Sequence, residues 1–416
     1  MELKVIEYDE YLKFALKNKY VSIYQLPEWG DLKKTNGWVP YLLGLYDGKK
    51  LVGVTLLLEN MMPFNISLFY APRGFLLDMT NYELLSTFTK EVKKFIRGKH
   101  GFMLKVDPNV IYKLYDQDGN FKEDVDVSVL DNLKKLGYKH LGFTKNFETL
   151  QPRYLCRFAL SKDYNTTLET LSKTTRKNIA KTLKMGVRVR EIDVSEIDLF
   201  VSILSCAGQE KEFIIRPVWY YKKMYELMSD YIKLYITYID TEEYYRYVIN
   251  EIDATKKELI NIEKFQNKGK KLLDAKDKLI ERQANLEKEL EQATQMRSSE
   301  KQINIGALMS IFIKDEGITF MSGTISAYKR FNPKYAYYNK HIEDCIKENK
   351  KYCNFYGISG DLNKNSKYYN IYEIKKGFNP EVVELVGEFD LINNYFVYYG
   401  YKVALRMYKL LKKIKK

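Results

Sequence analysis

The chain has 416 residues, 45% of them hydrophobic, which is enough apolar content for packed cores and excludes global disorder. Lysine and arginine exceed aspartate and glutamate by 14, and this favours a polyanionic partner: RNA, an anionic membrane face or a phosphate-bearing substrate. Neither a signal peptide nor an apolar run of about 20 residues occurs, which predicts a soluble cytoplasmic protein.

Residues 1–149 have the element order of an N-acetyltransferase-like α/β domain. Two strands, Trp38–Tyr46 and Lys50–Leu58, are joined through Asp47-Gly48, which is a strong hairpin signal. A strand and a helix precede this hairpin, and a strand, an amphipathic helix and a buried strand follow it: Lys4–Tyr8, Glu10–Lys17, Ile66–Tyr70, Tyr82–Arg97 and Phe102–Val106. Many α+β domains share this order, so the order alone identifies no family.

A second unit with the same plan begins near Leu150. We expect its hairpin strands at Tyr231–Thr237, Asn304–Lys314 and Ile318–Gly323. Gly186 stands where a helix C-cap is expected, and Ser195 is a candidate N-cap. The other expected elements are the strands Leu155–Leu160, Tyr352–Tyr356 and Val382–Glu384, and the helices Thr167–Met185, Ser195–Glu210, Trp219–Ser229, Tyr335–Asn349, Tyr369–Phe378 and Val397–Ile414.

The segment Thr241–Glu300 interrupts the sheet of this second unit. Apolar residues recur about every 3.5 positions and nearly all others are polar or charged, which predicts two helices packed on each other as an antiparallel coiled coil. Arms of about 22 residues around a turn at 267–270 would project roughly 33 Å. The arm is either a spacer or dimerisation device, or a lever that touches an extended partner such as tRNA. The seam residues are Val248, Ile252, Leu259, Ile262, Leu272, Leu279, Leu286, Leu290 and Ala293.

Two further patterns concern surfaces. The densest basic cluster of the folded part is either a solvated helix face or a phosphate-binding surface for tRNA, and consists chiefly of Lys173, Arg176, Lys177 and Lys181. The last helix carries an apolar stripe that we expect to pack in the core: Val403, Met407, Leu410, Leu411 and Ile414. The cations at its end, within 412–416, are either solvated or rest on an anionic membrane.

Few sequence motifs indicate metal binding, catalysis or cofactor binding. The three histidines are scattered, and the four cysteines have neither CxxC spacing nor a grouping with histidine, so we expect reduced core cysteines, no metal site and no histidine-based triad. No coenzyme A pyrophosphate loop, P-loop or dinucleotide fingerprint occurs. An acetyl-CoA, ATP or NAD dependence is therefore unsupported.

Six ordered motifs carry a resemblance that covers nearly the whole chain. They are Gln25-x-x-x-Trp29-Gly-x-x-Lys33, Tyr70-Ala-Pro-Arg-Gly74, Lys105-Val-Asp107-Pro108, Gln151-Pro-Arg153, Phe355-Tyr-Gly-x-Ser-Gly360, and Ile374-Lys-Lys-Gly-Phe378 followed by Val383-Glu384-x-x-Gly387-Glu388-Phe389. In these motifs the chain resembles the Fem family of peptidoglycan bridge-forming aminoacyltransferases. The resemblance implies an α/β (α+β) protein with two acetyltransferase-like domains, 1–149 with 386–416 and 150–240 with 301–385, and a coiled-coil arm, 241–300, inserted in the second.

The resemblance also implies a reaction. An aminoacyl-tRNA would donate its amino acid to the stem-peptide amine of a peptidoglycan precursor, with lipid II the expected acceptor, to build the interpeptide bridge. Because tRNA supplies an activated ester, no further cofactor is expected. The resemblance also implies peripheral contact with the inner membrane face. The residues alone leave two alternatives: an acetyltransferase-like N-acyltransferase with another acyl donor, and a non-catalytic RNA-binding coiled-coil protein.

The same resemblance assigns roles to single residues. Lys375 would stabilise the tetrahedral intermediate. Asp107 would act as general base, or the site would only position the amine while the tRNA ribose assists proton transfer. The substrate-binding residues would be Lys33, Arg216, Tyr220, Arg73 and Tyr70, with Arg216 and Tyr220 on one helix face. Alternatives remain for four of these assignments. Asp107 and Arg73 could instead be structural residues of turns. Lys34 could replace Lys33 in substrate binding, and Lys376 could replace Lys375 in stabilising the intermediate.

Overall fold

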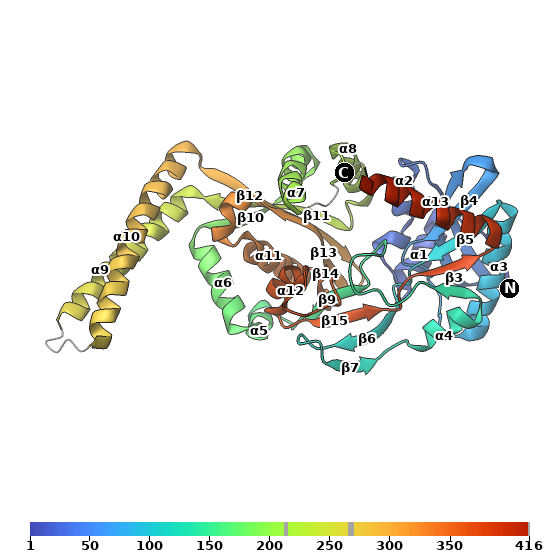
Figure 1. The fold of residues 1–416 in the computed structure, drawn as a ribbon, viewed down its shortest axis with the longest axis horizontal. Helices are drawn as coiled ribbons and strands as arrows, with labels where there is room; N and C mark the ends of the chain where they lie inside the picture. The colour runs from blue at the N-terminus through green and yellow to red at the C-terminus, as the bar shows by residue number, and fades with distance from the viewer. Residues whose placement is uncertain (212–214, 265–269, 415–416) are drawn as a thin grey trace.

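The computed structural model describes residues 1–211, 215–264 and 270–414, and in these residues the strands form two mixed sheets, one of seven strands and one of nine. Figure 1 shows the sheets side by side along the long axis of the molecule, with a helical arm projecting at one end. The expected turn at 267–270 lies largely outside the described residues.

The first sheet has the order β1-β2-β3-β4-β5-β16-β8. Most neighbours are antiparallel, but β4 and β5 are parallel and are paired from Ser67 with Gly101 to Ala71 with Val106. The strands are β1 (Glu2–Val5), β2 (Val39–Asp47), β3 (Lys50–Met62), β4 (Ile66–Ala71), β5 (Gly101–Val106), β16 (Phe389–Ile392) and β8 (Tyr138–His140). The helices of this part are α1 (Tyr8–Lys17), α2 (Pro27–Lys34), α3 (Tyr82–Gly98), α4 (Ser128–Lys135) and α13 (Tyr395–Ile414).

The second sheet has the order β10-β11-β12-β13-β14-β9-β15-β6-β7. Its strands are β10 (Val187–Ile192), β11 (Ile232–Asp240), β12 (Gln302–Ile313), β13 (Glu316–Thr324), β14 (Tyr352–Ile358), β9 (Tyr154–Ala159), β15 (Glu381–Leu385), β6 (Ile111–Tyr115) and β7 (Phe121–Asp124). Its helices are α5 (Tyr164–Glu169), α6 (Lys173–Lys184), α7 (Ile197–Lys211), α8 (Val218–Met228), α11 (Pro333–Lys347) and α12 (Tyr369–Lys376). The hairpin β6–β7 comes from the stretch assigned to the first domain, but it pairs with β15 of this sheet.

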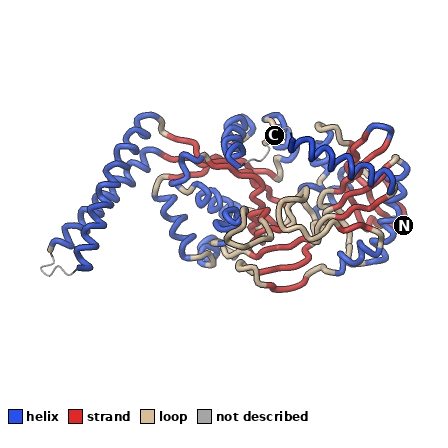
Figure 2. Tube along the Cα trace, in the orientation of Figure 1, coloured by secondary structure: helices blue, strands red, loops and turns tan. Residues whose placement is uncertain are grey.

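The arm consists of α9 (Thr241–Glu263) and α10 (Lys270–Ser299), which stand clear of both sheets in Figure 2. Four of the expected seam residues are buried, namely Val248, Ile252, Leu286 and Ala293, and the other five are half-buried. At 1.5 Å per residue, α10 is roughly 45 Å long. The predicted mixed α/β fold with an inserted antiparallel arm is confirmed.

Two local expectations were wrong. The helix expected over Thr167–Met185 is divided into α5 and α6, because Asp163 and Ser172 each accept a hydrogen bond from a backbone N–H and so begin a separate helix. Asp193, not Ser195, accepts the capping bond ahead of α7. Gly186, by contrast, has a φ of +74° directly after α6, as a C-cap requires.

The two faces of the second sheet differ in chemistry because strand side chains alternate. Cys156 and Phe158 of β9 and Phe355 of β14 point into the apolar core beneath α11 and α12. Arg157 of β9 and Tyr356 of β14 face the other way and line a cavity between the two parts of the molecule. No helix in the described residues is long and apolar enough to cross a membrane.

Candidate active site

A cavity of about 350 Å³ lies between the two parts of the molecule, lined by strands of the second sheet and by loops of the first part. The hydroxyl groups of Tyr24 and Tyr356 are hydrogen-bonded at 2.8 Å across this junction. Arg73 also crosses it, because its guanidinium donates to the Pro152 carbonyl at 2.7 Å. Arg157 and Asn354 add polar groups from the second sheet. The resulting wall is aromatic and polar, with Arg157 paired to Glu316 and Arg73 close to Asp107, and it suits a polar ligand of moderate size.

Asp107 is buried beside this cavity and holds one of its walls in place. It follows β5, and its Oδ1 accepts the backbone N–H of Arg73 at 2.9 Å, while Oδ2 is 3.8 Å from the Arg73 guanidinium. Burial raises the pKa of Asp107 to about 6, against the opposing effect of Arg73. Burial, and then the charge of Asp107, also raises the pKa of Tyr70, which lies nearby. Arg73 lines the cavity, and Asp107 and Tyr70 support it from behind.

Lys33, Arg216 and Tyr220 come together where α2 of the first part meets α8 of the second. The Lys33 ammonium donates to the Tyr220 hydroxyl at 3.2 Å and lies 4.5 Å from the centre of the Trp29 ring. Burial and then the nearby Arg216 lower the pKa of Lys33 to about 8. Among the described residues neither cation has a carboxylate partner, so the pair presents uncompensated positive charge to an anion such as a phosphate.

Two details of this group differ from the expectation. Arg216 is not on a helix, because α8 begins at Val218 after Pro217, and a residue that precedes proline disfavours the helical conformation. Its guanidinium carbon is nevertheless 5.8 Å from the Tyr220 ring centre. Lys34, which competes with Lys33, is exposed and forms an ion pair with Asp31 at 2.7 Å. The positions of the two side chains therefore favour Lys33 over Lys34 as the residue that binds substrate.

Lys375 lies on α12, on the core face of the second sheet. Its side chain is 7% exposed and its ammonium donates to the Gly357 carbonyl at 2.9 Å. Burial lowers the pKa of Lys375 to about 8. Its neighbour Lys376 is instead ion-paired with Asp118 at 2.6 Å near the surface. Of the two lysines, Lys375 is thus the one held in the interior, without a carboxylate partner in the described chain.

Gly357 lies in a part of β14 that is not paired with its parallel neighbour, β13. The β13–β14 ladder pairs Glu316–Ile318 with Tyr352–Asn354 only, although β13 runs to Thr324 and β14 to Ile358. The corresponding strands of the first sheet, β4 and β5, stay paired almost to their ends. In the second sheet, β13 and β14 thus separate next to Lys375. In the first sheet, the hydrogen bond between Arg73 and Asp107 instead joins the segments that follow β4 and β5.

The helix that carries the basic cluster, α6, begins next to the end of α12, the helix that carries Lys375. All four cations of the cluster are on α6 and exposed, and within the described residues none of them takes part in an ion pair: Lys173, Arg176, Lys177 and Lys181. The backbone N–H of Ser172, which caps α6, donates to the carbonyl of Gly377 just after α12 at 3.0 Å. The start of α6 therefore lies beside the end of the helix that carries Lys375. Lys33 and Arg216 are not part of this group and lie at the contact of α2 with α8.

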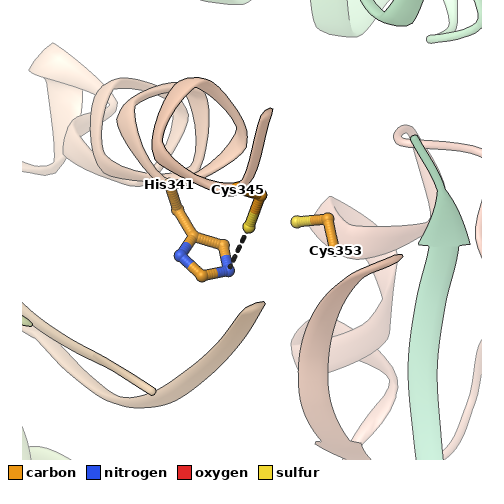
Figure 3. Close-up of side chains that lie close together, drawn as sticks. All are labelled: His341, Cys345 and Cys353. Atoms are coloured by element: carbon orange, nitrogen blue, oxygen red, sulfur yellow. Dashed lines mark hydrogen bonds between the residues drawn. The ribbon is translucent and has the colours of Figure 1, made fainter. Parts of the chain in front are cut away.

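The expectation that no cysteine groups with histidine was wrong. His341 and Cys345 are one turn apart on α11, and Cys353 of β14 faces them, so that their ligand atoms all lie within 4.8 Å (Figure 3). The three are fully buried, and the Ser310 hydroxyl is 2.9 Å from His341 Nδ1. They are the described residues best placed to hold a metal ion, but they lie on the core face and do not line the cavity. Cys206, expected in the core, is exposed.

Sequence reasoning missed the cavity residues Tyr24, Arg157, Asn354 and Tyr356. Tyr356 stands inside one of the six motifs, so it could have been found there. Arg157 and Asn354 gave a weaker signal, namely polar residues that alternate with the buried Cys156, Phe158 and Phe355 on two strands.

Comparison with known proteins identifies the family of this chain. The FemAB family profile matches residues 6–406. The chain is 29% identical over 416 residues to aminoacyltransferase FemA of Staphylococcus epidermidis, with 98% of both chains covered, and 26% identical to FemA of a bovine strain of Staphylococcus aureus, with 91% of this chain and 92% of that protein covered. The crystal structure of FemX superimposes with a TM-score of 0.76 at 22% identity, covering 96% of this chain and 99% of FemX, so the two share a fold. As its motifs predicted, the chain therefore belongs to the FemAB family, whose aminoacyltransferases add amino acids to peptidoglycan precursors to form the interpeptide bridge.

Proposed function

We propose that this chain transfers an amino acid from an aminoacyl-tRNA to the stem-peptide amine of a lipid-linked peptidoglycan precursor at the inner membrane face. The observation that carries the proposal is the placement of two unpaired cationic centres around the junction of the sheets. Lys33 with Arg216 suits the precursor's phosphates, and Lys375 lies beside the place where β13 and β14 part.

The donor approaches on the helix-covered face of the second sheet in this proposal. The tRNA backbone follows the exposed cations of α6, which adjoin the end of α12 at Gly377. The aminoacyl ester then reaches the gap beside β14, where the Lys375 ammonium supports charge on its carbonyl oxygen.

The acceptor occupies the cavity on the opposite face. Its diphosphate is bound by Lys33 and Arg216, which lie outside the lining of this cavity at the contact of α2 with α8, and its peptide extends past Tyr24, Arg73 and Tyr356. The amine nitrogen attacks the ester carbonyl, a C–N bond forms, and the bond from that carbon to the ribose oxygen breaks. The amine proton passes to the departing ribose oxygen, which becomes a hydroxyl, with Asp107 as the candidate intermediate base because its pKa is about 6. The ester is already activated, so the proposal requires no cofactor.

A transfer assay with product mass as the readout tests the proposal. Purified protein, a pool of charged tRNA and a lysine-containing lipid-linked precursor should yield a precursor heavier by one aminoacyl residue. A later-step enzyme would extend only a precursor that already carries a residue. Transfer from an acyl thioester instead of tRNA would establish a different N-acyltransferase. Inertness with every donor and acceptor would refute the proposal and favour an RNA-binding scaffold.

A variant of α6 tests the donor surface separately. Replacing Lys173, Arg176 and Lys177 by Ala should raise KM for aminoacyl-tRNA and flatten its salt dependence, because phosphate contacts are lost, and should leave KM for the acceptor unchanged. The matched control replaces Lys90 and Lys94, which are exposed on α3 of the first part. Equal effects of both sets would indicate non-specific charge and contradict this docking of the tRNA.

A further inference from the structure

The last helix, α13, has two apolar faces, but the described structure covers only one of them. The covered face packs on the first sheet: Tyr398 is buried with its hydroxyl 2.9 Å from Asp390, Lys402 is ion-paired with the same carboxylate at 3.0 Å, and the Tyr401 ring is 5.4 Å from that of Phe102. The other face is an exposed stripe made of Phe396, Tyr399, Val403, Met407, Leu410 and Leu411. Four of its residues, Val403, Met407, Leu410 and Leu411, were expected to pack in the core, and that expectation was wrong; the side chain of Ile414, expected there too, lies outside the described ones.

The spacing of these six residues places them on one side of the helix, since they follow each other at intervals of three or four positions with Leu411 beside Leu410. Phe396 is 91% exposed, and the others are exposed by half or more. An isolated exposed apolar side chain is normal, but a continuous row along a helix indicates a surface that is covered by a partner.

A turn of the first sheet extends this surface. Phe64, at the tip between β3 and β4, is 95% exposed and Met61 is also exposed. Phe64 and Ile66 share a shallow hollow with Asn393, Asn394 and Val397 at the start of α13, so the tip lies next to the exposed stripe. The lining of this hollow also includes the polar residues Arg97 and His100, and we call the aromatic tip and the stripe together the docking surface.

The positive charge of residues 395–416 indicates which kind of partner covers the docking surface. Residues 395–416 contain seven lysines and arginines and no aspartate or glutamate. An apolar helix face flanked by cations is the pattern of helices that lie in the interface of an anionic membrane. A second copy of this chain would bring the same positive charge to the contact, whereas anionic headgroups supply the opposite charge.

We infer that the docking surface, formed by the exposed face of α13 and the Phe64 tip, seats the protein on a bilayer that contains anionic lipid. The inference rests on the proposed function only in that a lipid-linked acceptor requires such a position. In the seated protein, Phe64 and Phe396 enter the headgroup region, and the exposed Arg406 contacts lipid phosphates. The Lys402–Asp390 ion pair keeps the helix on the first sheet during this contact.

Sedimentation of the full-length protein with vesicles tests the inference. Phosphatidylcholine vesicles that contain phosphatidylglycerol should bind the protein, and pure phosphatidylcholine vesicles should bind it much more weakly. The double variant Phe64→Ser/Phe396→Ser and the double variant Met407→Ser/Leu411→Ser should each lower the vesicle partition coefficient by roughly tenfold or more, since each removes two apolar side chains from the interface. Phe121→Ser, on the exposed strand β7, is the matched control and should bind like the wild type.

Two further measurements separate this inference from the proposed function. Transfer to a water-soluble, nucleotide-linked precursor should be unchanged in the docking variants, which also shows that they are folded. Vesicle binding without any transfer would overturn the proposed function alone. Wild-type binding by the docking variants, or a wild-type dimer that both double variants convert to monomers, would overturn the inference, the latter because a second copy would then cover the surface.

Discussion

Replacing Lys375 by Met should make the protein more stable and far less active at the same time. The pKa of Lys375 is lowered from 10.5 to about 8 by burial, so the charged side chain destabilises the folded state below pH 8. At about 1.4 kcal/mol for each pKa unit, the penalty is roughly 3 kcal/mol. Methionine removes this penalty but cannot donate to the Gly357 carbonyl, which costs about 1 kcal/mol. The net gain is about 2 kcal/mol near pH 7.

The sign of the pH dependence is a second test of the same reasoning. A lysine with a lowered folded-state pKa binds fewer protons in the folded than in the unfolded state between pH 8 and pH 10.5. The free energy of unfolding of the wild type should therefore rise with pH across this window, relative to Lys375→Met. Turnover should respond in the opposite direction, because a neutral lysine stabilises an oxyanion poorly, and should fall above pH 8.

Urea unfolding followed by tryptophan fluorescence measures the stability, and steady-state transfer measures the activity. Lys375→Met should lower kcat by about 100-fold with little change in KM for the acceptor. Lys376→Met is the matched control; its lysine is ion-paired near the surface, so stability should change by less than about 1 kcal/mol and kcat should be retained. A Lys375→Met protein that is less stable than the wild type at pH 7, or equally active, would refute the reasoning.

Three further substitutions test the rest of the site and its support. Lys33→Ala should raise KM for the acceptor by roughly tenfold to 100-fold, whereas Lys34→Ala should not; equal effects would contradict the assignment of the phosphates to Lys33. Transfer by the wild type should increase with pH through about 6 if Asp107 accepts the proton, and Asp107→Asn should abolish that step in the pH–rate profile, so its persistence would exclude Asp107 as the base. Gly317→Ala should lower the free energy of unfolding by about 1–3 kcal/mol, because the new methyl group would lie 2.2 Å from Cys345 Sγ. Gly98→Ala, which faces open space, should leave stability nearly unchanged, and urea unfolding compares the two.

The parts of the fold that were predictable are those with strong local signals. The hairpin across Asp47-Gly48 and the coiled-coil seam from Val248 to Ala293 were identified because turn chemistry and a regular apolar period act within a few residues. The strands β6 and β16 were missed, because they are short and their partners, β15 and β5, are distant in the sequence. Periodicity also could not decide whether the stripe on α13 meets a core or solvent.

The candidate site was predictable to the level of motifs but not of single charges. Adjacent lysines looked equivalent in the sequence, and only the structure shows that Asp31 engages Lys34 and Asp118 engages Lys376. Asp118 is far from Lys376 along the chain, so no local pattern connects them. The burial that lowers the pKa of Lys375 likewise depends on how α12 packs on the second sheet.

The position of β16 has a consequence for biosynthesis. This strand lies between β5 and β8 in the first sheet, yet it is formed by Phe389–Ile392, after nearly all of the chain has been made. The strands of the second sheet end at Leu385, so on the ribosome the later sheet can be complete while the earlier one still lacks a strand. Until β16 emerges, the edge of β5 is an open template for pairing with another nascent chain. The amino-terminal half is therefore the part of this enzyme that most needs protection during synthesis.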